Sequence, residues 1–176
     1  LHAVRGERDV PEALWPALMA RIDLSAQGEA GDNVCAFLDM LAFAEGTILY
    51  GGDDGYNVLV GGKTFDSYEK HPKVYVPLTR YKVTSSAAGR YQFLWKTWQA
   101  LALKLDLPDF GPVSQDRAAI ELIRERKALK DVRDGNIILA IQKCRPIWAS
   151  LPGAGYGQRE HKMTDLLREY SKAGGM

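Results

Sequence analysis

The chain has 176 residues, of which 46% are hydrophobic and 26% charged, and its formal net charge is +1 at pH 7. This length predicts one main domain, and the near-neutral charge argues against nucleic-acid binding through a strong basic field. No apolar run approaches the ~20 residues that a membrane-spanning helix needs. We therefore expect membrane contact only through a segment upstream of Leu1. We also expect the protein to be a monomer.

The cysteines and histidines do not form a recognisable metal motif. His2, His71 and His161 lack the paired spacings of a zinc site, so no metal is expected. Cys35 and Cys144 are predicted to be free, partly buried thiols. A disulfide or redox switch stays open as an alternative, because only geometry can test it.

Residues 1–33 are predicted to be an N-terminal extension made of a short helix and a linker, ahead of a main domain at 34–176. Asp9 before Pro11 marks a helix start. Apolar residues then recur every four positions, at Val10, Leu14, Leu18 and Ile22. Pro16 inside this pattern predicts either a kink or a later start. The small and polar run Ser25–Asn33 is typical of a linker. We expect the helix to dock on the main domain, with membrane or cell-wall contact as the alternative.

A second helix, capped by Asn33 and ended by Gly46, is predicted to form the centre of the main domain. Its apolar stripe contains Val34, Phe37, Leu38, Leu41 and Ala42. Glu45 falls in the last turn, beside the negative end of the helix dipole. A carboxylate is harder to ionise there, so its pKa is expected to be raised.

The glycine-rich segment that follows predicts a small hairpin, with strand Tyr56–Val60, a turn at Gly61-Gly62 and a second strand at Lys63–Phe65. Residues 66–88 are expected to be mostly loop. Further helices are expected at 91–105, from Ser114, from Asp134 and at 160–172. The predicted fold class is therefore α+β, mainly helical, with one small β-hairpin sheet after the first core helix.

The candidate for chemistry is Glu45, followed by the hairpin and by two loops that place Tyr and Gln beside glycines. These loops are Gly89–Gln92 and Gly153–Gln158. Cleavage of a glycosidic bond needs a proton donor whose pKa lies near neutrality, in a partly apolar pocket. Sugars also need amide and hydroxyl partners, and glycines let the backbone approach them closely.

The same residues carry a family resemblance across most of the chain, in one order. The matching motifs are Phe37–Ala42, Glu45–Thr47, Gly55-Tyr56, Val58, Val60–Gly62, Ala88–Gln92, Ser114–Asp116, Ile147–Gln158 and Glu160–Lys162. From about Phe37 to Gly175 the chain resembles the phage lambda-type endolysins, which are lysozymes of the lytic transglycosylase family.

The resemblance implies a lysozyme-like fold and a peptidoglycan substrate, cleaved between N-acetylmuramic acid and N-acetylglucosamine. In that family one Glu, here Glu45, protonates the glycosidic oxygen. It then takes the proton from the C6 hydroxyl of muramic acid, which leaves a 1,6-anhydro sugar. No metal or organic cofactor is implied. Such an enzyme is made in the host cytoplasm and acts in the host periplasm during lysis.

By position, the resemblance also implies substrate-binding residues: Tyr56, Asn57, Val58, Tyr91, Gln92, Tyr156 and Gln158. Tyr156 is expected to orient the carboxyl group of Glu45, and Tyr91 and Gln92 to line the groove. Structural roles remain alternatives for both tyrosines, because Tyr91 begins an apolar helical stripe and Tyr156 can anchor its loop.

The chain departs from the family pattern around Asp53-Asp54, where the segment is shorter and acidic instead of basic, and at Ala44, where the family has a hydroxyl. If either aspartate faces Glu45, the protein would be a hydrolytic muramidase with two carboxylates. A non-catalytic glycan-binding module on the same fold is the second alternative.

Overall fold

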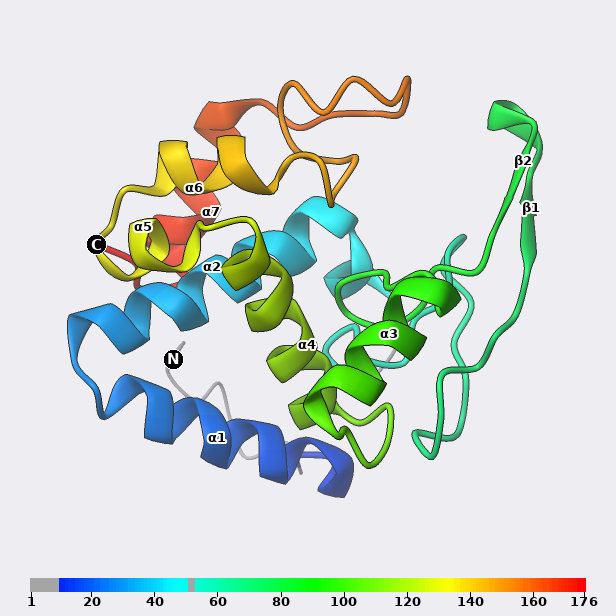
Figure 1. Ribbon diagram of the computed structural model, residues 1–176, viewed down its shortest axis with the longest axis horizontal. Helices are drawn as coiled ribbons and strands as arrows, with labels where there is room; N and C mark the ends of the chain where they lie inside the picture. The colour runs from blue at the N-terminus through cyan, green and yellow to red at the C-terminus, as the bar shows by residue number, and fades with distance from the viewer. Residues whose placement is uncertain (1–9, 51–52) are drawn as a thin grey trace.

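The computed structural model describes residues 10–50 and 53–176, and it is mostly helical with one small antiparallel sheet (Figure 1). The helical elements are η1 (Glu12–Leu14), α1 (Trp15–Ser25), α2 (Glu29–Glu45), η2 (Thr47–Leu49), η3 (Thr79–Tyr81), α3 (Trp95–Leu105), α4 (Pro112–Glu125), α5 (Leu129–Arg133), α6 (Ile137–Cys144) and α7 (Met163–Lys172). The strands are β1 (Val76–Leu78) and β2 (Val83–Ser85). The predicted α+β class is confirmed.

Helix α1 begins at Trp15 and has Pro16 in its first turn. Proline is tolerated there because the first N–H groups of a helix have no intrahelical partner. The later start was therefore the correct alternative to a kink, whereas the predicted start at Asp9 lies outside the described residues. The helix contacts α2 and α4, and Ala17 is buried.

The predicted linker at Ser25–Asn33 is wrong for most of its length. After a tight turn, Gly28 adopts φ +76 and α2 begins at Glu29, so the expected domain boundary at residue 33 falls inside this helix. Asn33 is buried and does not cap the helix; its amide oxygen accepts a hydrogen bond from the Met176 N–H at 2.8 Å. The small residues that suggested a linker have a packing role instead. At Gly31, for example, a Cβ would lie 1.7 Å from the carbonyl oxygen of Leu24. The small residues allow α1 and α2 to approach closely.

Helix α2 runs through the centre of the fold and contacts α1, α5 and α7 (Figure 1). Its fully buried side chains include Phe37, Leu38, Met40 and Leu41. Gly46 ends the helix in the left-handed conformation at φ +74, and its N–H bonds back to the carbonyls of Ala42 and Phe43. The predicted end of the helix, with Glu45 in its last turn, is confirmed.

The sheet lies at different residues from those predicted. β1 and β2 pair antiparallel, with Val76 opposite Ser85 and Leu78 opposite Val83, inside the segment expected to be loop. The chain does turn at Gly61-Gly62, but there it forms only an isolated bridge between Val58 and Thr64. Leu59 instead pairs with Ala88, so this segment is held by the loop before α3.

The later helices mostly follow the predicted order with shifted starts. α3 begins at Trp95 because residues up to Phe93 form a turn in which Gln92 has φ +52. Ser114 lies inside α4, where its hydroxyl donates to Asp109, and Gly111 is the N-cap. Helix α5 was not predicted. In the described part of the chain, no helix is long and apolar enough to cross a bilayer.

Candidate functional site

Glu45, at the end of α2, lines a cavity of about 580 Å³. The cavity lies between the last turn of α2, the segment around the Val58–Thr64 bridge, Tyr81 of η3 and the loop after α6. Its lining residues are Phe43, Ala44, Glu45, Gly46, Thr47, Leu49, Tyr50, Val58, Leu59, Val60, Gly61, Gly62, Tyr81, Gln92, Ser150, Gln158, Arg159 and His161. The cavity thus presents a carboxyl group, aromatic rings and amide groups in one groove.

The carboxyl group of Glu45 is partly buried and has one side-chain hydrogen bond, from the Ser150 hydroxyl to Oε1 at 2.5 Å. Burial raises the pKa of Glu45 from 4.5 to about 7, and the Ser150 hydrogen bond opposes this rise only in part. The predicted direction is confirmed. At neutral pH a substantial fraction of Glu45 carries the proton that a general acid must donate.

The turn that carries Glu45 is held from two sides. His161 Nε2 lies 3.0 Å from the carbonyl oxygen of Ala44, and its ring lies 5.1 Å from that of Phe43. The Thr47 hydroxyl donates to the carbonyl oxygen of Arg90 at 2.7 Å and lies 3.3 Å from that of Ala42. These contacts fix the end of α2 against the loops on both sides.

Three of the predicted substrate-binding residues line the cavity together with Glu45: Val58, Gln92 and Gln158. The Gln92 amide donates to the carbonyl oxygens of Val58 and Gly89, at 3.2 and 2.9 Å, and so ties two walls of the cavity together. Gln158 is exposed on the loop after α6. Gln92 and Gln158 carry amide groups that can act as polar partners for a sugar, whereas the side chain of Val58 is apolar.

The side chains of Tyr56 and Tyr91 do not line the cavity, so they lie away from the groove in which they were predicted to bind substrate. Their side chains are 3% and 1% exposed, and both hydroxyls donate to Asp116 Oδ1, at 2.8 and 2.5 Å. Asn57 is also absent from the cavity lining, and its buried Oδ1 has no hydrogen-bond partner among the described residues. The core alternative for Tyr91 was correct.

Tyr156 does not orient Glu45. Its ring is 56% exposed, and its hydroxyl donates to the carbonyl oxygen of Pro146 at 2.9 Å, which anchors the loop. The group that orients Glu45 is Ser150, which sequence reasoning missed. The only signal was its hydroxyl within the Ile147–Gln158 motif.

Asp53 and Asp54 both point to partners away from the cavity. Asp53 accepts a hydrogen bond from the Tyr68 hydroxyl at 2.8 Å, and Asp54 forms an ion pair with Arg90. Neither lines the cavity, where Glu45 is the one carboxylate among the described residues. The arrangement therefore brings no second carboxylate opposite Glu45 within the described chain.

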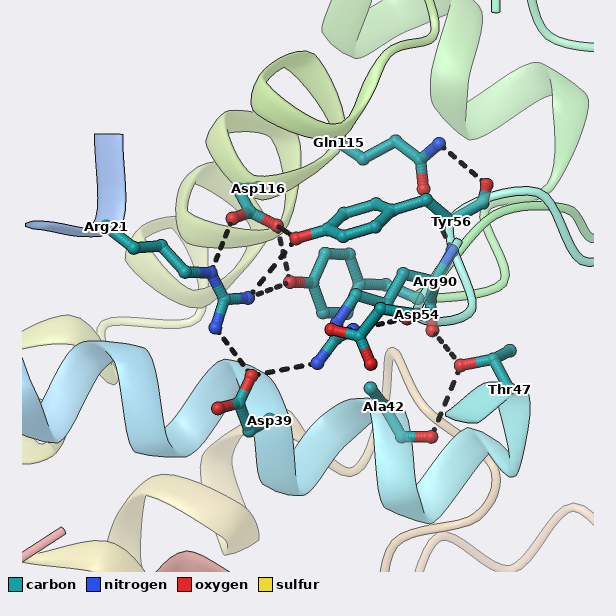
Figure 2. Close-up of polar contacts among 10 residues, drawn as sticks. Arg21, Asp39, Ala42, Thr47, Asp54, Tyr56, Arg90, Gln115 and Asp116 are labelled. Carbon is teal, nitrogen blue, oxygen red and sulfur yellow. Dashed lines mark hydrogen bonds and ion pairs between the residues drawn. The ribbon is translucent and has the colours of Figure 1, made fainter. Parts of the chain in front are cut away.

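A partly buried polar network lies on the other side of the turn and joins α1, α2 and α4 (Figure 2). Arg21 of α1 pairs with Asp39 of α2 and Asp116 of α4, and Arg90 pairs with Asp39 and Asp54. Arg90 thus fixes its loop through two carboxylate groups. Gln115 completes the network by accepting the Arg90 N–H at 2.8 Å.

Cys35 and Cys144 are free thiols in this structure. Among residues 10–50 and 53–176, no three His, Cys, Asp or Glu side chains are grouped as ligands for a metal ion.

Comparison with known proteins supports the sequence resemblance. The sequence model of the endolysin family matches residues 35–176. The endolysin of Escherichia phage P2 is 49% identical over 158 residues, covering 82% of this chain and 94% of that protein. The endolysin of Escherichia phage lambda is 49% identical over 143 residues, covering 80% and 90%.

Solved structures agree with these relatives. The lysozyme of bacteriophage lambda complexed with a chitohexasaccharide superposes with a TM-score of 0.80 at 47% identity, covering 82% of this chain and 96% of that one. A second structure of lysozyme from bacteriophage lambda gives a TM-score of 0.77 at 46% identity, with the same coverage. This chain therefore belongs to the endolysin family, with the fold of the phage lambda lysozyme.

Proposed function

We propose that this endolysin cleaves peptidoglycan as a lytic transglycosylase, with Glu45 as the single acid and base. The bond cleaved is the β-1,4 linkage between N-acetylmuramic acid and N-acetylglucosamine. The observation that carries the proposal is a protonatable carboxyl group, with a pKa of about 7, that lines a groove in which it is the one carboxylate among the described residues.

The reaction balances with this one carboxyl group. Glu45 donates its proton to the glycosidic oxygen as the bond from C1 to that oxygen breaks, and it becomes a carboxylate. The C6 hydroxyl oxygen of the same muramic acid then bonds to C1, and its proton passes to Glu45. The products are a shortened strand and a 1,6-anhydro end; no water is consumed and Glu45 regains its proton.

The groove fits a polysaccharide. Tyr50 and Tyr81 offer aromatic faces for the C–H surfaces of sugars, while Gln92 and Gln158 offer amide groups. The lambda lysozyme in complex with a chitohexasaccharide shares this fold, and that ligand is an oligosaccharide. Both findings support a glycan strand as the substrate.

Mass spectrometry of digested peptidoglycan tests the mechanism. We expect the product strands to carry 1,6-anhydro ends. Reducing ends on all products would establish hydrolysis and contradict the proposal. Glu45→Gln is expected to abolish cleavage while the fold and glycan binding persist. Asp53→Asn is the matched control and should retain activity, because Asp53 binds Tyr68 outside the cavity.

We also propose that the protein acts in the periplasm of a Gram-negative host after synthesis in the host cytoplasm. The relatives from two Escherichia phages support such a host. Purified protein added to cells with a permeabilised outer membrane is expected to reduce turbidity. Unchanged turbidity together with retained glycan binding would instead favour a non-catalytic binding module.

A further inference from the structure

We propose that Arg21, which α1 contributes from outside the family-matched residues 35–176, is a positioning residue for the catalytic site. It does not touch substrate or Glu45. It acts by holding Arg90 and Tyr91, the two residues through which the position of Glu45 is supported. This inference rests on the proposed function, because it assigns Arg21 a role in that cleavage.

The guanidinium group of Arg21 joins three elements at once (Figure 2). Its Nε bonds to Asp116 Oδ2 at 2.9 Å and its Nη1 to Asp39 Oδ1 at 2.5 Å. Its Nη2 donates to the Tyr91 hydroxyl at 3.0 Å. A planar fork with several donors can make these contacts simultaneously, whereas a lysine ammonium is a single point of charge.

The first support runs through Arg90. Asp39 Oδ1 accepts Arg90 Nη2 at 2.8 Å while it also binds Arg21, so the two guanidinium groups share one carboxylate oxygen. The carbonyl oxygen of Arg90 accepts the Thr47 hydroxyl at 2.7 Å. Thr47 stands two residues after Glu45, and its hydroxyl also approaches the end of α2. The position of Arg90 therefore sets the position of the turn that carries Glu45.

The second support runs through Tyr91. Arg21 and Asp116 hold its phenol group, and its backbone carbonyl oxygen accepts Trp148 Nε1 at 3.0 Å. Trp148 is buried and stands two residues before Ser150, the hydrogen-bond donor to Glu45. The position of Tyr91 therefore sets the distance at which Ser150 meets the catalytic carboxyl group.

The residues of both supports lie inside the family match, but both supports are held by Arg21, which lies outside it. Asp116 is 6% exposed, and among the described residues Arg21 is the cation that pairs with it. Because proton transfer depends on geometry at the scale of an ångström, loosening of either support should slow the chemical step more than substrate binding.

The test compares Arg21→Met and Arg21→Lys with the unchanged protein. The matched control is Arg117→Met, which removes the same charge from the exposed face of α4. For each folded protein, kcat and KM are measured on purified peptidoglycan across a pH series. The titratable groups that line the cavity around Glu45 are Tyr50, Tyr81, Arg159 and His161, and none of these variants changes them.

We expect Arg21→Met to lower kcat by about 10- to 100-fold with little change in KM. We expect Arg21→Lys to lose less, and Arg117→Met to match the unchanged protein. The high-pH limb of kcat should move to lower pH in Arg21→Met, because a loosened site admits water to Glu45. Burial is the larger cause of the raised pKa, so its loss outweighs a weakened Ser150 hydrogen bond. If Arg21→Met does not fold, the same kcat and pH measurements on Arg21→Lys test the proposal.

Two results would overturn the proposal: kcat and the pH limb both unchanged in the folded variants, or a loss confined to KM. Either result would leave Arg21 a purely structural residue. A failure of the proposed function looks different, because the unchanged protein would then cleave no peptidoglycan. If the unchanged protein cleaves and the Arg21 variants match it, only this inference fails.

Discussion

The Ser150 hydroxyl donates a 2.5 Å hydrogen bond to Oε1 of Glu45, although the two residues lie 105 positions apart in the chain. Ser150 belongs to the loop after α6, and Glu45 ends α2. The carboxyl group of Glu45 is thus held by an uncharged hydroxyl group from a distant part of the chain. This contact orients Glu45 and lowers its pKa in part, against the larger rise that burial causes.

Replacement of Ser150 by Ala should raise the pKa of Glu45 further, because the hydroxyl stabilises the ionised form. The high-pH limb of activity is expected to move to higher pH, while kcat falls by about 10-fold as the carboxyl group loses its orientation. A pH series of cleavage rates measures both effects. Ser171→Ala, at an exposed serine of α7, is the control and should change neither. A limb that moves to lower pH would contradict this prediction.

Replacement of Glu45 by Gln should stabilise the fold at alkaline pH. The pKa of Glu45 is about 7 in the folded protein against an ordinary value of 4.5, so the folded state binds the proton more tightly. Stability is therefore lost as pH rises from 4.5 through 7. Above pH 7 the gain for the variant is up to about 3 kcal/mol.

Urea unfolding at pH 4 and pH 8.5 checks this dependence. The difference between Glu45→Gln and the unchanged protein should be near zero at the lower pH and largest at the higher one. Glu12→Gln, at an exposed position of η1, should give no such trend. An equal difference at both pH values would show that burial does not destabilise the ionised carboxyl group.

Replacement of Gly31 by Ala should destabilise the protein, although Ala normally favours a helix interior by about 1 kcal/mol over Gly. The new Cβ would lie 1.7 Å from the Leu24 carbonyl oxygen, so α1 must move away from α2. We expect a loss of about 1–3 kcal/mol in the free energy of unfolding. Ala30→Gly, one residue earlier, provides the comparison because it changes helix propensity alone. A stabilised Gly31→Ala variant would refute the close contact.

The network at Asp39 predicts a loss of stability in acid. Burial opposes ionisation of Asp39, but the charges of Arg21 and Arg90 outweigh it and lower the pKa of this carboxyl group. Its stabilising effect is therefore complete above the ordinary value of 3.8 and is lost as pH falls through the lowered pKa. Melting temperatures measured from pH 5 to pH 2 should fall more steeply for the unchanged protein than for Asp39→Asn.

Local signals identified the end of α2 and its candidate catalytic residue. Gly46 stops an apolar helical stripe directly after Glu45, so both the helix end and the carboxyl group were predictable from a few neighbouring residues. The linker was mispredicted because Gly and Ala serve flexible segments and close helix contacts equally well. Only the position of Leu24 in the structure shows that Gly31 serves a close contact between helices.

Contacts between distant residues could not be predicted from the sequence. Arg21 and Asp116 are 95 positions apart, and a lone arginine in an amphipathic helix is typical of a solvent-facing side chain. Tyr91 was assigned to the groove together with Gln92, because the family resemblance places their shared motif there. Their side chains diverge because the turn places Gln92 in the left-handed conformation, whereas Tyr91 points to Asp116.

The β1–β2 hairpin, which extends beside the helices in Figure 1, has three residues in each strand and no buried side chain in either. Tyr81, in the turn between the strands, nevertheless lines the cavity opposite α2. We expect the amide protons of this hairpin to exchange with solvent through small local openings, and those of the buried helix α2 to exchange only on global unfolding. The groove therefore joins a buried wall, which holds Glu45 in place, to an exposed wall at Tyr81 that we expect to be more mobile.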